Sequence, residues 1–263
     1  MHNAAYAALG LNWRYLAFEV DPNNLRAAIE GAQVMGFAGL NLTVPHKLLA
    51  VELVDELDVS AKTWGAVNTI QFVTDPQGGK ARAIGYNTDA EGLARSLQAD
   101  LQLSLRGARV LLLGAGGAGR TAALKLAESG VAELFLVNRT ASKAEEIAVE
   151  IRRRWPDVRV TVGYPTGEVD LLLNATSLGL KPGDVSPLAD ASFSLTRARA
   201  VYDMIYKPAE TPLLQAARAA GCRTANGIGM LVGQGAKAFE IWTQQAAPVA
   251  VMRQAVEGSV YGR

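Results

Sequence analysis

The chain has 263 residues, is 49% hydrophobic and carries a formal net charge of +1, which gives no sign of a surface for nucleic acid or an acidic partner. Its 2 histidines exclude a histidine-rich metal site, and its 1 cysteine, Cys222, excludes an internal disulfide and fits a reducing compartment. No signal peptide and no apolar run of membrane-spanning length is recognisable. We therefore expect a cytoplasmic protein that binds no metal, nucleic acid or membrane.

The first part of the chain mixes helical and strand patterns. Helices are expected at residues 2–10 and 23–35, the second of which follows the start signal Asp21-Pro22-Asn23. A short strand at 39–44 precedes helices that continue through Leu57 and around residues 60–63. Strands at 67–73 and 80–86 flank a predicted hairpin turn at 75–79.

The remainder of the chain alternates strands with helices. Helices are expected at 89–98, 142–154 and 211–220 and from about 230 to the end. A further helix is expected directly after the glycine turn at 114–119. Strands are expected at 110–113, 134–137, 158–162, 169–173 and 200–204. This alternation predicts a parallel sheet covered by helices, so the fold class is α/β.

A strand, a glycine turn, a helix and a second strand follow one another from Val110 to Val137. Gly114, Gly116 and Gly119 match the pattern G-x-G-x-x-G. The first glycine permits a tight turn, the second permits close approach of a pyrophosphate, and the third permits the helix to pack on the strand. The amides at the N-terminus of the helix then face the phosphate charge, which predicts a dinucleotide-binding unit.

The end of the second strand indicates which dinucleotide is bound. An NAD site usually places an acidic residue there for the ribose 2′-hydroxyl, whereas this chain has Asn138 followed by Arg139. A guanidinium can pair with a 2′-phosphate through two parallel hydrogen bonds, and Lys143 adds a second positive charge. We therefore predict NADP as the cofactor.

Three polar clusters precede this unit, at residues 41–47, 65–69 and 85–89. Each lies at the end of a predicted strand or in a loop, where binding residues concentrate. Lys47 and Asp89 could form an ammonium–carboxylate pair that supplies a proton during reduction of a carbonyl group. The residues alone leave another interpretation open, in which Lys47 opens a helix and Asp89 caps one.

The order of these motifs resembles that of the shikimate dehydrogenase family of aromatic amino-acid biosynthesis. The resemblance runs from Met1 to about Trp242. The motifs that carry it are Asn41–Lys47, Gly65–Thr69, Gly85–Asp89, Gly114–Gly119, Asn138–Thr140, Asn174–Gly179, Asp203–Pro208 and Asn226–Gln234. The resemblance implies reversible, NADPH-dependent reduction of 3-dehydroshikimate to shikimate.

The resemblance also implies roles for individual residues. Lys47 and Asp89 would be the catalytic pair. The substrate would be bound by Thr43, Asn68, Asp89, Tyr206 and Gln234. The cofactor would be bound by Gly114, Gly116, Gly117, Gly119, Asn138, Arg139, Thr140, Lys143, Thr176, Ser177 and Gly227.

The implied architecture has two domains. We expect a discontinuous α/β substrate-binding domain at residues 1–88 and 224–263 and a Rossmann-type NADP-binding domain at 89–223, in a monomer or a homodimer. The family normally carries a further segment ahead of the Met-His-Asn of this chain, with a first strand and a turn of serines that bind the substrate carboxylate. Because hydrogen bonds to charged groups contribute about 1.5–3 kcal/mol each, we expect the chain as given to bind NADPH and turn over poorly.

Three alternatives remain open from the sequence. A quinate/shikimate dehydrogenase that uses NAD is disfavoured by Asn138 and Arg139, which say little about quinate. A methylenetetrahydrofolate dehydrogenase of similar fold is disfavoured by the motifs at 85–89 and 138–140. A non-catalytic sensor of shikimate or NADPH needs no proton donor, so the presence of both Lys47 and Asp89 disfavours it.

Overall fold

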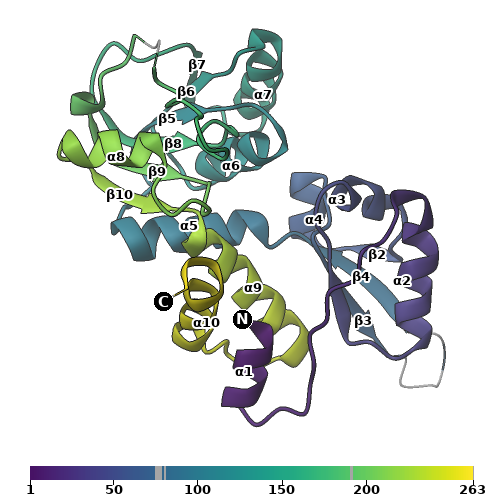
Figure 1. Cartoon of the computed structure of the whole chain (residues 1–263). Coiled ribbons are helices and arrows are strands. Elements are labelled where there is room, and N and C mark those ends of the chain that lie inside the picture. The colour runs from purple at the N-terminus through teal and green to yellow at the C-terminus, as the bar shows by residue number, and fades with distance from the viewer. Residues whose placement is uncertain (75–78, 80, 190–191, 263) are drawn as a thin grey trace. The chain divides into compact units, whose positions relative to one another are not determined.

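The computed structural model describes residues 1–74, 79, 81–189 and 192–262. The chain forms two compact units (Figure 1). Unit 1 comprises Met1–Gly92 and Val232–Val256, and unit 2 comprises Leu93–Leu231 and Glu257–Arg263. Each unit contains a sheet with helices packed on it, which confirms the α/β fold class. The domain boundaries expected from the sequence stay a prediction.

Unit 1 is built on a four-stranded sheet with the order β1-β3-β4-β2. The strands are β1 (Gly39–Asn41), β2 (Glu56–Leu57), β3 (Thr69–Val73) and β4 (Arg82–Tyr86). Strand β3 is antiparallel to both β1 and β4, whereas β2 is parallel to β4. The antiparallel pairing of β3 with β4 is the one expected of two strands that follow each other without a crossover helix. Of the predicted hairpin turn between them, residues 75–78 lie outside the described residues, as does residue 80 of the strand predicted at 80–86.

The prediction of helix through Leu57 is also wrong at its end. Glu56 and Leu57 pair with β4, and the backbone N–H of Ala83 donates a 2.7 Å hydrogen bond to the Asp55 carboxylate. This tertiary pairing overrides the local helical pattern. The strand predicted at 39–44 likewise ends at Asn41.

Unit 1 also contains short helices. They include α1 (His2–Ala8), η1 (Pro22–Asn24), α2 (Leu25–Val34), α3 (His46–Leu49), η2 (Ala50–Glu52) and α4 (Val59–Trp64). Of these, α2 and α4 pack against its sheet. Helices α5 (Asp89–Leu101), α9 (Ile228–Thr243) and α10 (Val249–Tyr261) each contribute to both units. Ile70 and Phe72 of β3 join the core that α2 covers, while Gln71, on the alternate face, donates a hydrogen bond to the carbonyl of Ile241 in α9.

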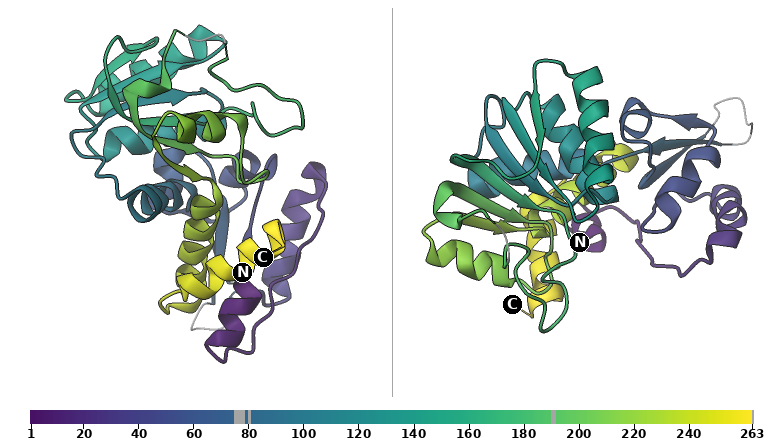
Figure 2. Two further views of the ribbon diagram at one scale, coloured as in Figure 1. Left: turned by 60° about the vertical axis from the view of Figure 1, so that its left-hand side comes forward. Right: turned by 90° about the horizontal axis from the view of Figure 1, so that it is seen from above.

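Unit 2 contains a parallel six-stranded sheet with the order β10-β9-β8-β5-β6-β7. Figure 2 shows the strands side by side. They are β5 (Arg109–Leu113), β6 (Glu133–Val137), β7 (Arg159–Val162), β8 (Val169–Asn174), β9 (Ala198–Asp203) and β10 (Arg223–Asn226). Numbered within the unit this is the order 6-5-4-1-2-3, which is that of a Rossmann domain with its switch point between β5 and β8.

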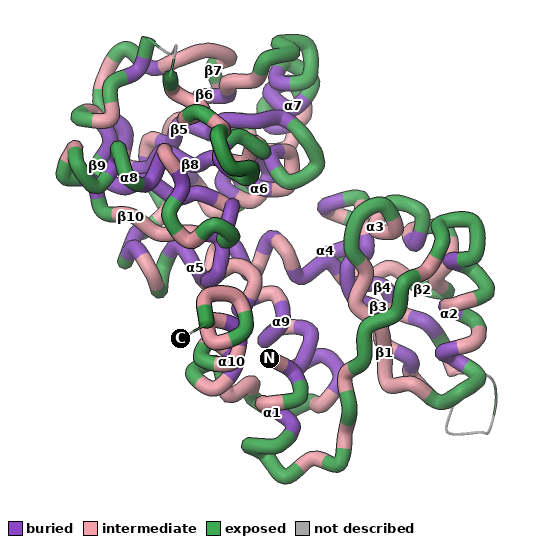
Figure 3. Tube along the Cα trace, in the orientation of Figure 1, coloured by how far each residue is buried: buried purple, intermediate pink, exposed green. Residues whose placement is uncertain are grey.

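Helices cover both faces of this sheet. They are α6 (Gly117–Glu128), α7 (Ala141–Arg154) and α8 (Pro212–Ala219), with η3 (Leu195–Arg197) ahead of β9. Leu111 and Leu113 of β5 pack in one cluster with Leu213 of α8, so Val110 and Leu112 point to the opposite face. The leucine and valine side chains of β5 are all buried, and Figure 3 shows β5, β8 and β9 mainly in the colour of buried residues.

Within the described ranges, no helix is both long and apolar enough to cross a membrane.

Candidate active site

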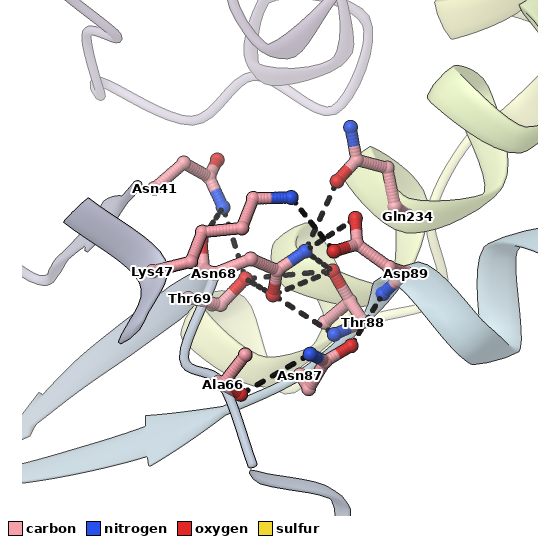
Figure 4. A network of polar contacts seen from close by, with 9 residues as sticks. All are labelled: Asn41, Lys47, Ala66, Asn68, Thr69, Asn87, Thr88, Asp89 and Gln234. Carbon is pink, nitrogen blue, oxygen red and sulfur yellow. Dashed lines mark hydrogen bonds and ion pairs between the residues drawn. The ribbon is translucent and has the colours of Figure 1, made fainter. Parts of the chain in front are cut away.

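Lys47 and Asp89 form an ion pair in unit 1 (Figure 4). Lys47 lies in the first turn of α3 and Asp89 is the first residue of α5, and Nζ donates to Oδ2 over 2.7 Å. The two side chains are 25% and 14% exposed, so the pair is shielded from bulk water yet reachable by a small molecule. A charge-assisted bond of this length keeps a proton donor and an acceptor together, which is the arrangement that acid–base chemistry needs.

Asn68 lies beneath this pair and is only 1% exposed. Its Nδ2 donates to Oδ1 of Asp89 at 3.0 Å and to Oε1 of Gln234 at 3.1 Å. Its Oδ1 accepts a 2.9 Å hydrogen bond from the backbone N–H of Thr88. Asp89 therefore has one oxygen on Lys47 and the other on Asn68, which fixes the plane of its carboxylate.

Gln234 of α9 completes the network from the opposite side. Its Oε1 is occupied by Asn68, so its Nε2 points away from the network, as Figure 4 shows. The site thus offers an ammonium donor, an amide donor and a carboxylate acceptor, a combination suited to a hydroxylated ring. Thr43 lies on the exposed turn ahead of α3, where its carbonyl accepts from the N–H of His46.

In the glycine turn of unit 2, close backbone contacts explain two of the glycines. Gly114 has φ +106°, and a Cβ there would lie 2.9 Å from the backbone of Ala175. A Cβ on Gly119 would lie 2.2 Å from the carbonyl oxygen of Gly114. At Gly116 and Gly117, by contrast, an added Cβ would meet nothing within 4 Å. The chain's own packing requires the first and third glycines, while the space over the other two is open to a ligand.

Helix α6 begins at Gly117, and its N-cap, Gly116, provides no side-chain hydrogen bond to the first N–H groups. Those donors and the positive end of the helix dipole suit a phosphate group. The residues present therefore fit the pyrophosphate of a dinucleotide.

The end of β6 is joined to this turn by Asn138. Its Oδ1 accepts from the N–H of Ala115 at 3.0 Å, and its Nδ2 donates to the carbonyl of Thr140 at 2.8 Å. Arg139, Thr140 and Lys143 are exposed. Neither Arg139 nor Lys143 has an ion pair or a side-chain hydrogen bond within the described part of the chain, so both cations are available to an anion.

A second buried asparagine, Asn174, ends β8 beside the glycine turn. Its Oδ1 accepts from the N–H and the hydroxyl of Thr176 at 3.0 and 2.8 Å, and its Nδ2 donates to Asp203 at 3.0 Å. The methyl group of Thr176 would lie 3.1 Å from a Cβ on Gly114, so the loops after β5 and β8 touch. Ser177 follows on the exposed surface of the second loop.

Asp203 is the anchor of that loop and is itself fully buried. Besides Asn174, it accepts from the Thr211 hydroxyl at 2.7 Å and from the N–H of Ile205 at 3.1 Å. Burial raises the pKa of Asp203, against the effect of these hydrogen bonds. Sequence reasoning assigned Asp203 no role, and its position at the carboxyl end of a buried strand was the available signal.

Tyr206 and Gly227 lie farther along unit 2. Tyr206 is 38% exposed, and its carbonyl accepts a 2.8 Å hydrogen bond from the hydroxyl of Tyr261. Gly227 precedes α9, where a Cβ would lie 2.0 Å from the carbonyl oxygen of Met204.

The predicted site residues therefore fall into two groups. In unit 1 the structure brings together Lys47, Asn68, Asp89 and Gln234 but leaves Thr43 outside their network. Unit 2 holds the predicted cofactor residues and Tyr206. Sequence reasoning assigned no role to Thr69 and Thr88, although both lie in the quoted motifs and bond to Asn68. The described residues contain no group of three or more His, Cys, Asp or Glu side chains placed to hold a metal ion.

Three family models match segments of the chain. Residues 1–70 match the shikimate dehydrogenase substrate binding domain, 95–177 match shikimate / quinate 5-dehydrogenase, and 227–257 match the shikimate 5'-dehydrogenase C-terminal domain. A shikimate dehydrogenase (NADP(+)) of Methanopyrus kandleri is 42% identical over 97% of this chain and 89% of its own length.

Two solved structures with similar folds also cover nearly the whole chain. Shikimate 5-dehydrogenase of Thermus thermophilus, in complex with NADP(H) and shikimate, is 34% identical with a TM-score of 0.83, over 97% of this chain and 92% of its own. A ligand-free 5-ketofructose reductase of a Gluconobacter species is 38% identical with a TM-score of 0.85, over 98% of this chain and 91% of its own.

Proposed function

Because the chain belongs to the shikimate dehydrogenase family, we propose that it catalyses the reversible, NADPH-dependent reduction of 3-dehydroshikimate to shikimate. The observation that carries this proposal is the 2.7 Å contact between Lys47 Nζ and Asp89 Oδ2 inside a network of neutral hydrogen-bonding side chains. A ketone can be reduced there only if its oxygen receives a proton as its carbon receives a hydride.

In this mechanism Lys47 is the proton donor. NADPH, when bound, supplies the hydride to the carbonyl carbon. The Lys47 ammonium gives one proton to the carbonyl oxygen, becomes a neutral amine and regains a proton from solvent. Asp89 accepts hydrogen bonds from Lys47 and Asn68, and thereby aligns the ammonium. In the reverse direction the neutral Lys47 removes the proton of the hydroxyl.

The substrate would be held by donors and acceptors around this pair. We assign this role to four residues of unit 1, namely Thr43, Asn68, Asp89 and Gln234, and also to Tyr206. The outward Nε2 of Gln234 is suited to a ring hydroxyl oxygen, since its Oε1 is already engaged. An exposed threonine hydroxyl and an exposed tyrosine add short-range hydrogen bonding without adding charge.

The cofactor would be held by the loops of unit 2. The open space over Gly116 and Gly117 and the start of α6 suit the pyrophosphate, with Gly114 and Gly119 shaping the turn. The exposed cations Arg139 and Lys143 suit the 2′-phosphate, with Asn138 and Thr140 beside them. Thr176, Ser177 and Gly227 are assigned to the remaining contacts with the cofactor.

We also place the protein in the cytoplasm, as a monomer or homodimer. The single cysteine, Cys222, is a free buried thiol that donates to the carbonyls of Leu195 and Ala198, an arrangement typical of a reducing compartment.

The test compares NADPH formation from NADP⁺ with shikimate or quinate against NADPH consumption with 5-ketofructose. We expect turnover with shikimate and NADP⁺ that exceeds turnover with NAD⁺ or with either other substrate. Absence of shikimate turnover in folded protein that binds NADPH would contradict the proposal. A preference for quinate or for the keto sugar would move the chain to another activity of the same family.

A further inference from the structure

A line of hydrogen bonds leads from Tyr15 through Asn41 and Thr69 to Asn68. The Tyr15 hydroxyl donates to Asn41 Oδ1 at 3.0 Å, and Asn41 Nδ2 lies 3.0 Å from Thr69 Oγ1. Thr69 Oγ1 in turn lies 3.0 Å from Asn68 Oδ1. Figure 4 shows Asn41, Thr69 and Asn68 in this succession ahead of Asp89.

The direction of each bond is determined by its surroundings. Asn41 Nδ2 also donates to the backbone carbonyl of Asn68, which can only accept, so Asn41 Oδ1 must face Tyr15. Burial raises the pKa of Tyr15, so its hydroxyl keeps the proton that it donates. Since Asn41 donates to the Thr69 oxygen, the Thr69 proton is free to go to Asn68.

At Asn68 the same direction is required by two further groups. The N–H of Thr88 can only donate, so Oδ1 of Asn68 must face it. An ionised Asp89 can only accept, so Nδ2 of Asn68 must face that carboxylate. Rotating the amide by half a turn would set donor against donor at the N–H of Thr88 and acceptor against acceptor at Asp89, and it would take from the Thr69 hydroxyl the acceptor of its proton.

Thr69 is the residue of this line whose hydroxyl can be removed by substitution with little change in packing. It is fully buried on β3 and touches Asn68 from a position that is 0% exposed, so no solvent replaces its hydroxyl. Its oxygen also lies 3.5 Å from the hydroxyl of Thr88, the neighbouring group on Asn68.

We propose that Thr69 is a positioning residue of the active site, which holds the Asn68 amide in the one orientation that supports Asp89 and turns the amide nitrogen of Gln234 outward. This inference rests on the proposed function. Thr69 acts through Asn68 and does not touch the substrate. The Tyr15–Asn41 pair fixes the direction in which the Thr69 hydroxyl donates.

Two variants separate the hydroxyl of Thr69 from its shape. Thr69→Val keeps the branched shape that suits a strand and loses the hydroxyl, whereas Thr69→Ser keeps the hydroxyl and loses a methyl group. If packing alone mattered, the valine variant would resemble the wild type and the serine variant would be the weaker enzyme. If the hydroxyl orients Asn68, the order is reversed.

We expect kcat/KM for shikimate to fall about tenfold in Thr69→Val, as for the loss of one buried hydrogen bond, and to stay within about twofold of wild type in Thr69→Ser. KM for NADP⁺ should be the same in all three proteins. Wild-type kcat/KM in Thr69→Val, or a larger loss in Thr69→Ser than in Thr69→Val, would overturn the inference.

A second measurement tests how firmly the Asn68 amide is held, without relying on enzyme turnover. The side-chain NH₂ signals of Asn68, assigned in ¹⁵N–¹H spectra by their absence in Asn68→Asp, should exchange with solvent at least about threefold faster in Thr69→Val than in wild type or Thr69→Ser. Equal exchange in the three proteins would overturn the role of Thr69. If wild type failed to oxidise shikimate but showed this difference, the proposed function would fail and the positioning role would stand.

Discussion

Two buried asparagines organise the polar regions of the two units, and their carboxylate partners differ. Asn68 in unit 1 and Asn174 in unit 2 each accept a backbone N–H with the amide oxygen and donate the amide nitrogen to an aspartate. Asp89 is partly exposed and paired with Lys47. Asp203 is fully buried, accepts neutral donors and has no ion pair among the residues that the structure describes.

Under the proposed function, one local arrangement serves two purposes. An amide–carboxylate contact with access to a small molecule and an adjacent ammonium can move a proton. The same contact, closed off and satisfied by Thr211 and Ile205, holds a loop in place. Variants of the two regions should therefore fail in different ways.

The largest effect is expected for Lys47→Ala. Removal of the proposed proton donor should lower kcat for shikimate oxidation by about 10²–10⁴ while NADPH affinity is retained. Steady-state kinetics and fluorescence titration of NADPH measure the two quantities. Lys62→Ala, on α4, is the matched control and should keep wild-type kcat. Unchanged kcat in Lys47→Ala would contradict the catalytic role that distinguishes the Lys47–Asp89 pair from Asp203.

Asp203→Ala should reduce stability instead. It leaves the Thr211 hydroxyl, the Asn174 amide and the N–H of Ile205 without their buried acceptor. At about 1–3 kcal/mol for each such group, the free energy of unfolding should fall by about 4 kcal/mol. Urea denaturation measures this change, and kcat at saturating ligands should change far less than in Lys47→Ala. A catalytic loss without destabilisation would contradict the structural role assigned to Asp203.

The two units should also respond in opposite ways to acid. Burial lowers the pKa of His2 in unit 1 to about 4, from an ordinary value of 6.5. The unfolded chain then binds the proton first, so stability is full above pH 6.5 and falls as the pH drops toward 4, by about 3 kcal/mol at most. Because the pKa of Asp203 is raised, its protonation at low pH favours the folded form of unit 2.

Hydrogen exchange of the core amides of each unit, followed between about pH 7 and about pH 4, measures this difference. Protection in unit 1 should decline more than in unit 2, and His2→Phe should remove the added decline. An identical decline in His2→Phe would show that another group causes it.

The smallest effect is expected for Arg139→Ala. Loss of one charged partner of the 2′-phosphate should weaken NADPH about tenfold and leave NADH unchanged. Isothermal titration with both cofactors tests this, and Arg152→Ala on α7 serves as an exposed-arginine control. An unaltered preference for NADPH over NADH would show that Arg139 does not bind the 2′-phosphate.

The sequence was most informative where one pattern has one structural cause. The glycine turn, the strands on each side of it and the α/β class were predictable because turn geometry and alternation leave few other solutions. The short strand β2 was not, since two residues that pair with a distant strand carry no local periodicity. The pairing of Lys47 with Asp89 was suggested by chemistry, but the inward oxygen of Gln234 and the line from Tyr15 to Asn68 depend on contacts between distant segments.

The most direct test of the central claim is chemical rescue of Lys47→Ala with added alkylamines during shikimate oxidation by NADP⁺. If Lys47 moves the proton, amines small enough to enter the site should restore turnover, to an extent that depends on the pKa of the amine. A folded variant that binds both ligands and is not rescued by any such amine, or that needs none, would contradict the account.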